Sequence, residues 1–135
     1  MKAKTLWLVF AGGAIGSIVR AFATSFGVDL WATLAVNIVG AAMLGLVHTA
    51  PRFAGESSQA FWSTGFCGGF TTLSGVVLFV VFGKTDDTGV VLAYVLATVA
   101  LGVAAYAAFA RIGKNLERKT LESKAITSKT REVKN

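Results

Sequence analysis

The sequence predicts an all-α membrane protein with four transmembrane helices. Of its 135 residues, 54% are hydrophobic, and the sequence also contains fifteen glycines and one proline. This composition suits neither an average soluble domain nor a disordered chain. A helix needs about 20 residues, each rising about 1.5 Å, to cross the hydrocarbon core of a bilayer. Four segments reach that length: Leu6 to Phe26, Leu30 to Ala50, Phe61 to Phe82, and Gly89 to Ala110.

The four segments leave little material for a domain outside the membrane. We expect a transmembrane domain over residues 1–112 and a basic cytoplasmic tail over residues 113–135 that is largely disordered. A pore that needs more walls than four short helices supply would require oligomerisation.

The first segment carries small residues and one cation at regular spacing. Gly12, Gly13 and Gly16 predict a face on which another backbone packs closely. Arg20 is the only charged residue inside the four segments, and at mid-depth it would cost about 2.5 to 3.5 kcal/mol. It should therefore face protein or water, either as an anchor that reaches the interface or as an electropositive element near a pore mouth.

The second segment contains one strongly polar side chain at mid-depth. An amide in lipid costs several kcal/mol unless it is hydrogen-bonded, so Asn37 should either bond to a neighbouring helix or donate to a permeating ion. His48 lies at the end of the segment with no second His, Cys or carboxylate nearby. This setting favours an interfacial histidine over a metal ligand or a pH sensor.

The third segment contains a polar interruption between Gly65 and Gly75. The pair Gly68-Gly69 disfavours a helix interior by about 1 kcal/mol per residue and predicts a broken helix near this point. Three hydroxyl residues follow the pair: Thr71, Thr72 and Ser74. They could bond back to helix carbonyls, or the break could line a cavity or hold an ion.

The fourth segment has a stripe with a period of four residues. Tyr94, Thr98 and Gly102 follow one another down a single face. Such a stripe is compatible with helix packing and with a polar track.

The positive charges predict an orientation. The net charge is +6, and eight of the thirteen basic residues lie after Ala110, which is typical of a cytoplasmic flank rather than a nucleic-acid arm. With four crossings, one side holds eleven basic residues: Lys2, Lys4, Arg52, Arg111, Lys114, Arg118, Lys119, Lys124, Lys129, Arg131 and Lys134. The other side holds Lys84, with Arg20 nearby. Both termini should therefore be cytoplasmic and the protein should lie in the plasma membrane.

Enzyme chemistry is disfavoured. One cysteine, Cys67, and one histidine cannot form a disulfide, a zinc site or a nucleophile and base pair with a third orienting group.

Three motifs in order resemble the bacterial fluoride channels, the Fluc or CrcB family. They are Gly12-Gly13-x-x-Gly16-x-x-x-Arg20, Asn37-x-x-Gly40-x-x-x-Leu44-Gly45, and Gly65-x-Cys67-Gly68-Gly69-x-Thr71-Thr72-x-Ser74. The resemblance implies an antiparallel dimer with two narrow pathways, passive export of fluoride from the cytosol, and a central structural Na⁺. It also implies that carbonyls of Gly68 and Thr71 hold the sodium.

The resemblance further assigns pore roles to individual residues. The implied fluoride-pathway residues are Arg20, Asn37, Thr72, Ser74, Tyr94 and Thr98. Fluoride leaves water only for dense hydrogen-bond donors, which amides, hydroxyls and the edges of aromatic rings can supply.

One departure from the family pattern affects the expected activity. Where the family has two phenylalanines, this chain has Leu73 and Val76, and Gly75 replaces a common threonine. Together with the strong charge bias, this leads to the hypothesis that the chain is a fixed-orientation subunit of a heterodimer with a paralogue. A homodimer and a non-conducting partner subunit remain alternatives. A small proton-coupled multidrug exporter is a further alternative, disfavoured because no segment contains a carboxylate.

Overall fold

The computed structural model describes residues 3–25, 30–75, 77 and 87–134, with side chains as far as Ile126, and the described part of the chain is helical. Three long helices are α1 (Ala3–Ala23), α2 (Leu30–Thr49) and α6 (Thr88–Lys134). Four short elements follow α2 in order: η1 (Pro51–Phe53), α3 (Glu56–Ser58), the π-helix η2 (Gln59–Cys67) and α4 (Gly68–Phe70).

Three helices have the length and composition of membrane spans. These are α1, α2 and the part of α6 from Thr88 to Ile126. At about 1.5 Å per residue, α1 is about 31 Å long, which matches a bilayer core. The third predicted span begins with α3, η2 and α4, is interrupted after Phe70, and is helical again at Ser74 and Gly75. Its predicted end at Phe82 lies outside the described residues.

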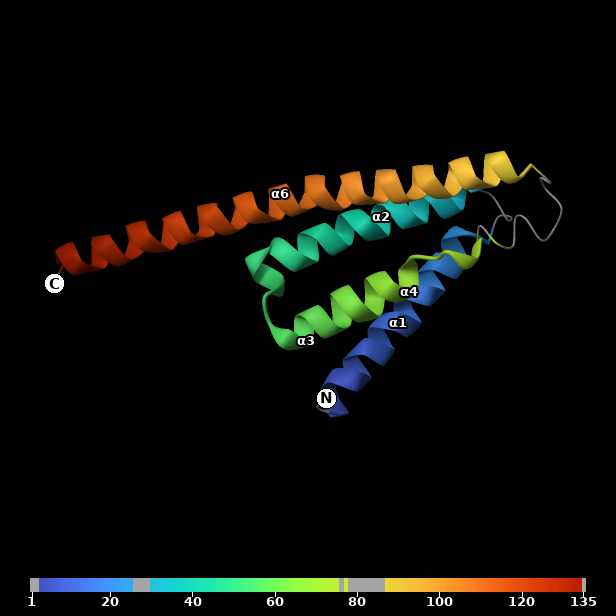
Figure 1. The fold of residues 1–135 in the computed structure, drawn as a ribbon. Helices are drawn as coiled ribbons and strands as arrows, with labels where there is room; N and C mark the ends of the chain where they lie inside the picture. The colour runs from blue at the N-terminus through green and yellow to red at the C-terminus, as the bar shows by residue number, and fades with distance from the viewer. Residues whose placement is uncertain (1–2, 26–29, 76, 78–86, 135) are drawn as a thin grey trace.

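The helices pack as two pairs. In one pair α1 lies along η2 and α4, and in the other α2 lies along α6 (Figure 1). Figure 1 also shows that α1 begins, and α6 ends, on the same side as η1 and α3. This placement agrees with an even number of crossings.

Glycines set the close packing of α1 against the third span. Gly12 and Gly16 are buried, and a Cβ at either position would overlap a backbone carbonyl, that of Phe61 or Phe66. The packed glycine face predicted for the first segment is therefore present.

The second pair is also packed through glycines. A Cβ at Gly45 would overlap the carbonyl of Tyr106, and one at Gly113 would overlap the Thr49 side chain. Gly113 is the last buried residue described in α6, because the side chains from Lys114 to Ile126 are all exposed.

The expectation of a largely disordered tail differs from the structure, in which α6 continues to Lys134. No Gly or Pro follows Gly113, and Lys, Arg, Glu, Ala and Leu there favour helix. Continuing a packed helix also avoids the cost of nucleating a new one. The 47 residues of α6 span about 70 Å, so the helix extends well past the bundle (Figure 1).

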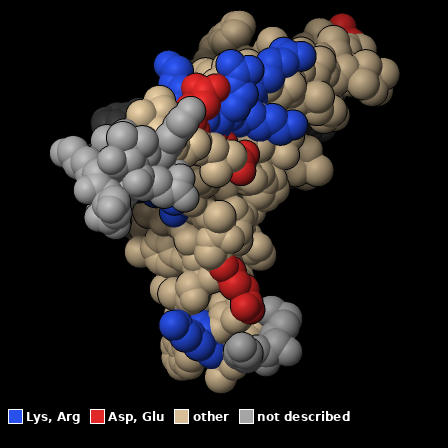
Figure 2. Space-filling model, turned by 90° about the vertical axis from the view of Figure 1, so that its left-hand side faces the viewer, with Lys and Arg blue, Asp and Glu red and all other residues tan. Residues whose placement is uncertain are grey.

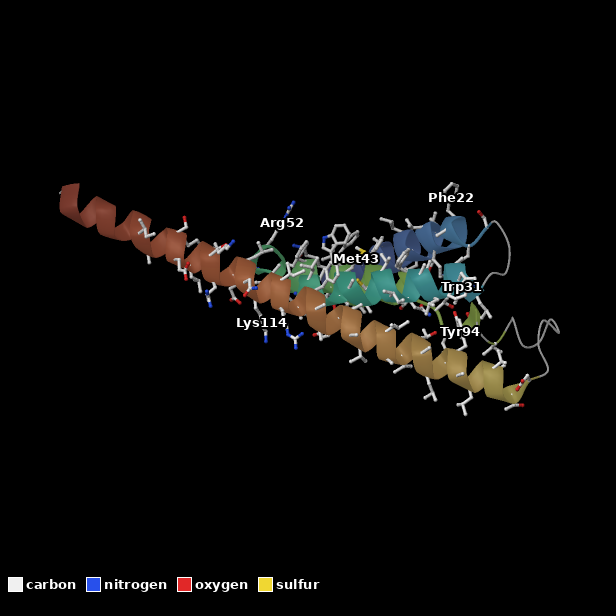
Figure 3. All side chains as sticks on the ribbon, turned by 90° about the horizontal axis from the view of Figure 1, so that it is seen from above. Phe22, Trp31, Met43, Arg52, Tyr94 and Lys114 are labelled. Carbon is white, nitrogen blue, oxygen red and sulfur yellow. The ribbon has the colours of Figure 1, made fainter. Side chains whose placement is uncertain are left out.

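The outer surface of the spans is apolar, as a lipid-facing surface should be. Trp7, Phe22 and Trp31 are each at least 70% exposed, and Phe22 points outward from α1 in Figure 3. Figure 2 shows the end of the molecule at which α6 finishes, and there Lys and Arg side chains stand out from a mainly uncharged surface.

Candidate functional site

The helix of the third span is interrupted at Thr71, two residues after the Gly68-Gly69 pair. Gly68 is still helical, with φ −64° and ψ −37°, whereas Thr71 is extended, with φ −78° and ψ 155°. A Cβ at Gly69 would overlap the backbone of Gly13. The helix therefore breaks just after the glycine pair near which the break was predicted. The pair itself lies in α4, and Gly69 packs on α1.

Asn37 bridges the break from α2. Its Nδ2 donates to the Thr72 carbonyl, and the Thr72 N–H donates to its Oδ1, each at 2.8 Å. In a continuous helix the Thr72 N–H would donate to the carbonyl of Gly68. Asn37 thus takes the place of a helical partner and releases the Gly68 carbonyl from that pairing. Of the two expectations for Asn37, the interhelical bond is the one present.

Two side chains of α1 reach carbonyls at the same break. The Ser17 hydroxyl donates to the carbonyl of Gly69 at 3.3 Å, and the Arg20 guanidinium donates to that of Thr71 at 3.5 Å. Arg20 is half-buried and faces protein, as its cost in lipid required. The sequence reasoning missed Ser17, although it lies on the Gly13, Gly16 and Arg20 face.

The hydroxyls of the third span divide into two kinds. Thr71 Oγ1 donates to the carbonyl of Cys67 at 3.0 Å, which is the ordinary return bond of a membrane helix. Thr72 Oγ1 and Ser74 Oγ instead pair with each other at 2.9 Å. Since one hydroxyl donates to the other, the pair retains one O–H for a further acceptor.

The predicted stripe on α6 lies against α2. Tyr94 points from α6 toward α2 (Figure 3), and its hydroxyl donates to the carbonyl of Leu30 at 2.8 Å. Thr98 is buried and donates to the Tyr94 carbonyl at 2.8 Å. The structure therefore brings Arg20, Asn37, Thr72 and Ser74 together at the break, while Tyr94 and Thr98 line the neighbouring α2–α6 seam.

One known protein family matches most of this chain. The family described as CrcB-like protein, Camphor Resistance (CrcB) matches residues 7–110, which include most of α1, all of α2, the break and the apolar first part of α6. This chain belongs to the CrcB family.

Curated relatives of this CrcB chain are named as channels. The fluoride-specific ion channel FluC of Agrobacterium fabrum is 38% identical over 119 residues, covering 81% of this chain and 95% of the relative. FluC 2 of Corynebacterium jeikeium is 33% identical over 135 residues, covering 81% and 79%. FluC 2 of Leifsonia xyli is 30% identical over 131 residues, covering 84% and 86%. No solved structure matches the chain. The prediction that the chain is not an enzyme is confirmed by its membership of a channel family.

Two departures from the family pattern can be placed in this CrcB chain. Leu73 is 67% exposed just after the break, and Val76 lies outside the described residues. At Gly75 a Cβ would lie 2.9 Å from the Thr33 side chain. A residue larger than glycine at position 75 would therefore require the Thr33 side chain to shift.

Proposed function

We propose that this chain is a subunit of a channel that exports fluoride passively from the cytosol. The proposal is carried by the broken third span, where Asn37 pairs with Thr72 and Arg20 reaches Thr71, in a chain of the CrcB family. We take fluoride as the transported ion because the relatives are named fluoride-specific ion channels.

The chemistry around the break suits a small, strongly hydrated anion. The Thr72 and Ser74 hydroxyls are paired, and Ser74 is exposed, so a donor can be offered outward. Arg20 raises the local potential while its guanidinium is engaged with a carbonyl. A pathway lined by such groups attracts fluoride without forming a trapping contact ion pair. We assign Tyr94 and Thr98 to the polar wall that continues along α2.

An antiparallel dimer with a structural Na⁺ is part of the proposal. Hard cations take several oxygen ligands, and the break offers two candidate carbonyls, that of Gly68, which the Thr72 N–H does not use, and that of Thr71. Gly68 is exposed, and a Cβ built there meets nothing within 4 Å. The residues therefore fit half of a cation site that a second subunit would complete. The Arg20 guanidinium, 3.5 Å from the Thr71 carbonyl, would share that carbonyl with the cation.

We propose that the partner is a paralogue of opposite orientation. Eleven basic residues on one side against one or two on the other favour a single orientation, with both termini in the cytoplasm and the spans in the plasma membrane. Relatives named FluC 2 support the existence of paired channel genes. The exposed Leu73, which lacks a ring quadrupole, favours one further candidate function, a partner subunit whose own pore does not conduct.

Reconstitution tests these proposals. We expect liposomes with this chain alone to release little fluoride, and liposomes that also contain an oppositely oriented paralogue to release fluoride rapidly and chloride slowly. Robust selective efflux from the chain alone would contradict the heterodimer proposal but would be consistent with a fluoride channel. Absence of fluoride efflux with every partner would contradict the fluoride-channel proposal. Cation transport driven by a pH gradient would instead support the multidrug exporter.

An Asn37→Ala variant of this chain in the mixed dimer tests whether this chain is a conducting or a non-conducting subunit. If this chain lines a conducting pathway, the variant lowers the flux of the pair. If the variant assembles and the flux is unchanged, the chain is the non-conducting partner.

A further inference from the structure

A three-way polar contact lies at the far end of α2 from Leu30. The exposed ring of His48 is hydrogen-bonded through Nε2 to the Ser63 hydroxyl at 2.8 Å and through Nδ1 to the Tyr106 hydroxyl at 3.2 Å. The two rings also meet edge to face, with centroids 5.9 Å apart. The contact joins α2, η2 and α6, and we call these three residues the His48 cluster.

The His48 cluster continues the stripe on α6. Tyr106 follows Gly102 by four residues, as Gly102 follows Thr98 and Thr98 follows Tyr94. Tyr94 bonds to Leu30, the first residue of α2, and Tyr106 bonds to His48 near its last. The stripe thus runs along the whole length of α2. The His48 cluster lies at its end, on the side of the bundle where α1 begins and α6 ends (Figure 1).

The proton state of His48 decides which hydrogens the two hydroxyls can offer. A neutral imidazole has one donor and one acceptor nitrogen, so one hydroxyl must donate to the ring. A protonated ring donates from both nitrogens, and both hydroxyls then accept from it. Protonation therefore releases an O–H for an anion and adds a positive charge. Histidine is the side chain that ordinarily changes charge between about pH 5 and 8.

The groups that surround His48 do not hold it in one charge state through an ion pair. Ser63 faces it from η2 and Tyr106 from α6. The charged residues at this end of the bundle include Lys4 on α1, Arg52 on η1, Glu56 on α3, and Arg111 and Lys114 on α6. The Glu56 carboxylate accepts from Thr5 at 3.4 Å, and within the described ranges no ion pair includes His48.

We propose that the His48 cluster is the cytoplasmic mouth of the fluoride route, and that its protonation promotes fluoride passage. This inference rests on the proposed function. An exporter with such a mouth conducts faster when the cytoplasm turns acidic.

Fluoride efflux at two pH values tests the inference. The channel is reconstituted with its partner, with the same pH on both sides, and protein-free vesicles correct for hydrogen fluoride leak. We expect wild-type flux to be at least about threefold higher at about pH 5.5 than at about pH 7.5. In His48→Gln the ratio falls to about one, and in Tyr106→Phe and Ser63→Ala it is reduced. Arg52→Gln, which removes a charge at the same end outside the cluster, keeps the wild-type ratio. An unchanged ratio in His48→Gln overturns the inference and leaves the channel proposal intact, whereas a wild-type channel without fluoride flux removes both.

A binding measurement keeps the inference falsifiable without transport. His48 is the only histidine, so ¹⁵N-histidine labelling reports on this ring alone. Because fluoride bound at the His48 cluster would contact the ring or its hydroxyl partners, added fluoride should shift the His48 signals at a fixed pH, and chloride should not. In Tyr106→Phe the fluoride response should shrink. His48 signals that fluoride leaves unchanged overturn the inference.

Discussion

The side chain of Asn37 forms hydrogen bonds with both backbone polar groups of Thr72, each at 2.8 Å. These two residues are 35 positions apart and lie on different spans. In a bilayer no water can replace a lost backbone partner, so one amide makes the break in the third span tolerable.

Replacement of Asn37 by alanine should therefore impair folding as well as conduction. Two half-buried backbone groups lose their partners, and we expect a loss of about 2 to 4 kcal/mol in the free energy of unfolding in detergent. Thermal unfolding and fluoride efflux measure the two effects. Thr64→Ala, which removes an exposed hydroxyl from η2, serves as the control and should change neither. Wild-type stability in Asn37→Ala with flux abolished would show that the amide serves the ion rather than the break.

The location of the break shows why the sequence predicts the region of the break but not the residue at which the helix ends. Local composition points to Gly68-Gly69, because adjacent glycines weaken a helix. Yet the helix ends where the Thr72 N–H donates to Asn37, a residue of the second span. Only the assembled bundle shows that Gly69 serves contact with Gly13.

The glycine pair offers a matched test. A Cβ at Gly69 would overlap the Gly13 backbone, whereas a Cβ at Gly68 meets nothing within 4 Å. We expect Gly69→Ala to lose folded protein, or to shift its melting temperature down strongly, because backbone cannot move aside cheaply. Gly68→Ala should retain the melting temperature of the wild-type chain. Size-exclusion chromatography and thermal unfolding check both variants, and equal behaviour of the two would contradict the packing described here.

Span positions were predictable because apolar length alone specifies them. The second span was expected from Leu30 and α2 begins there, and the fourth was expected from Gly89 and α6 begins at Thr88. The pairing of α2 with α6 was not predictable, since lipid-exposed helices give no amphipathic signal that names a neighbour. Tyr106 was missed although the spacing of Tyr94, Thr98 and Gly102 leads to it.

The tail should be dispensable for the stability of the bundle. Side chains from Lys114 to Ile126 are exposed, and the ion pair described there, Arg118 with Glu122 at 3.7 Å, is highly exposed and internal to the tail. Such pairs contribute little. A chain that ends at Lys114 should unfold at the wild-type temperature, whereas Gly113→Leu should unfold earlier because Gly113 packs on Thr49. A large destabilisation by the truncation would show that the tail packs on the bundle or on a partner.

In the full chain, hydrogen exchange should be fast in the tail, since an unpacked helix opens readily.

Restoring an aromatic ring after the break should increase conduction by this chain alone. Leu73 is 67% exposed, so phenylalanine can replace it without overpacking a core. A ring edge carries positive partial charge, and pairs of aromatic rings that use it gain about 0.5 to 1.5 kcal/mol. If a contact of similar strength lowers the barrier for fluoride by about 1 kcal/mol, efflux from liposomes rises about fivefold. Leu73→Met provides a control of similar volume without a ring. An equal rise in Leu73→Met would assign the effect to shape. No rise in Leu73→Phe, or in the double variant with Val76→Phe, would show that the missing aromatic residues do not limit conduction.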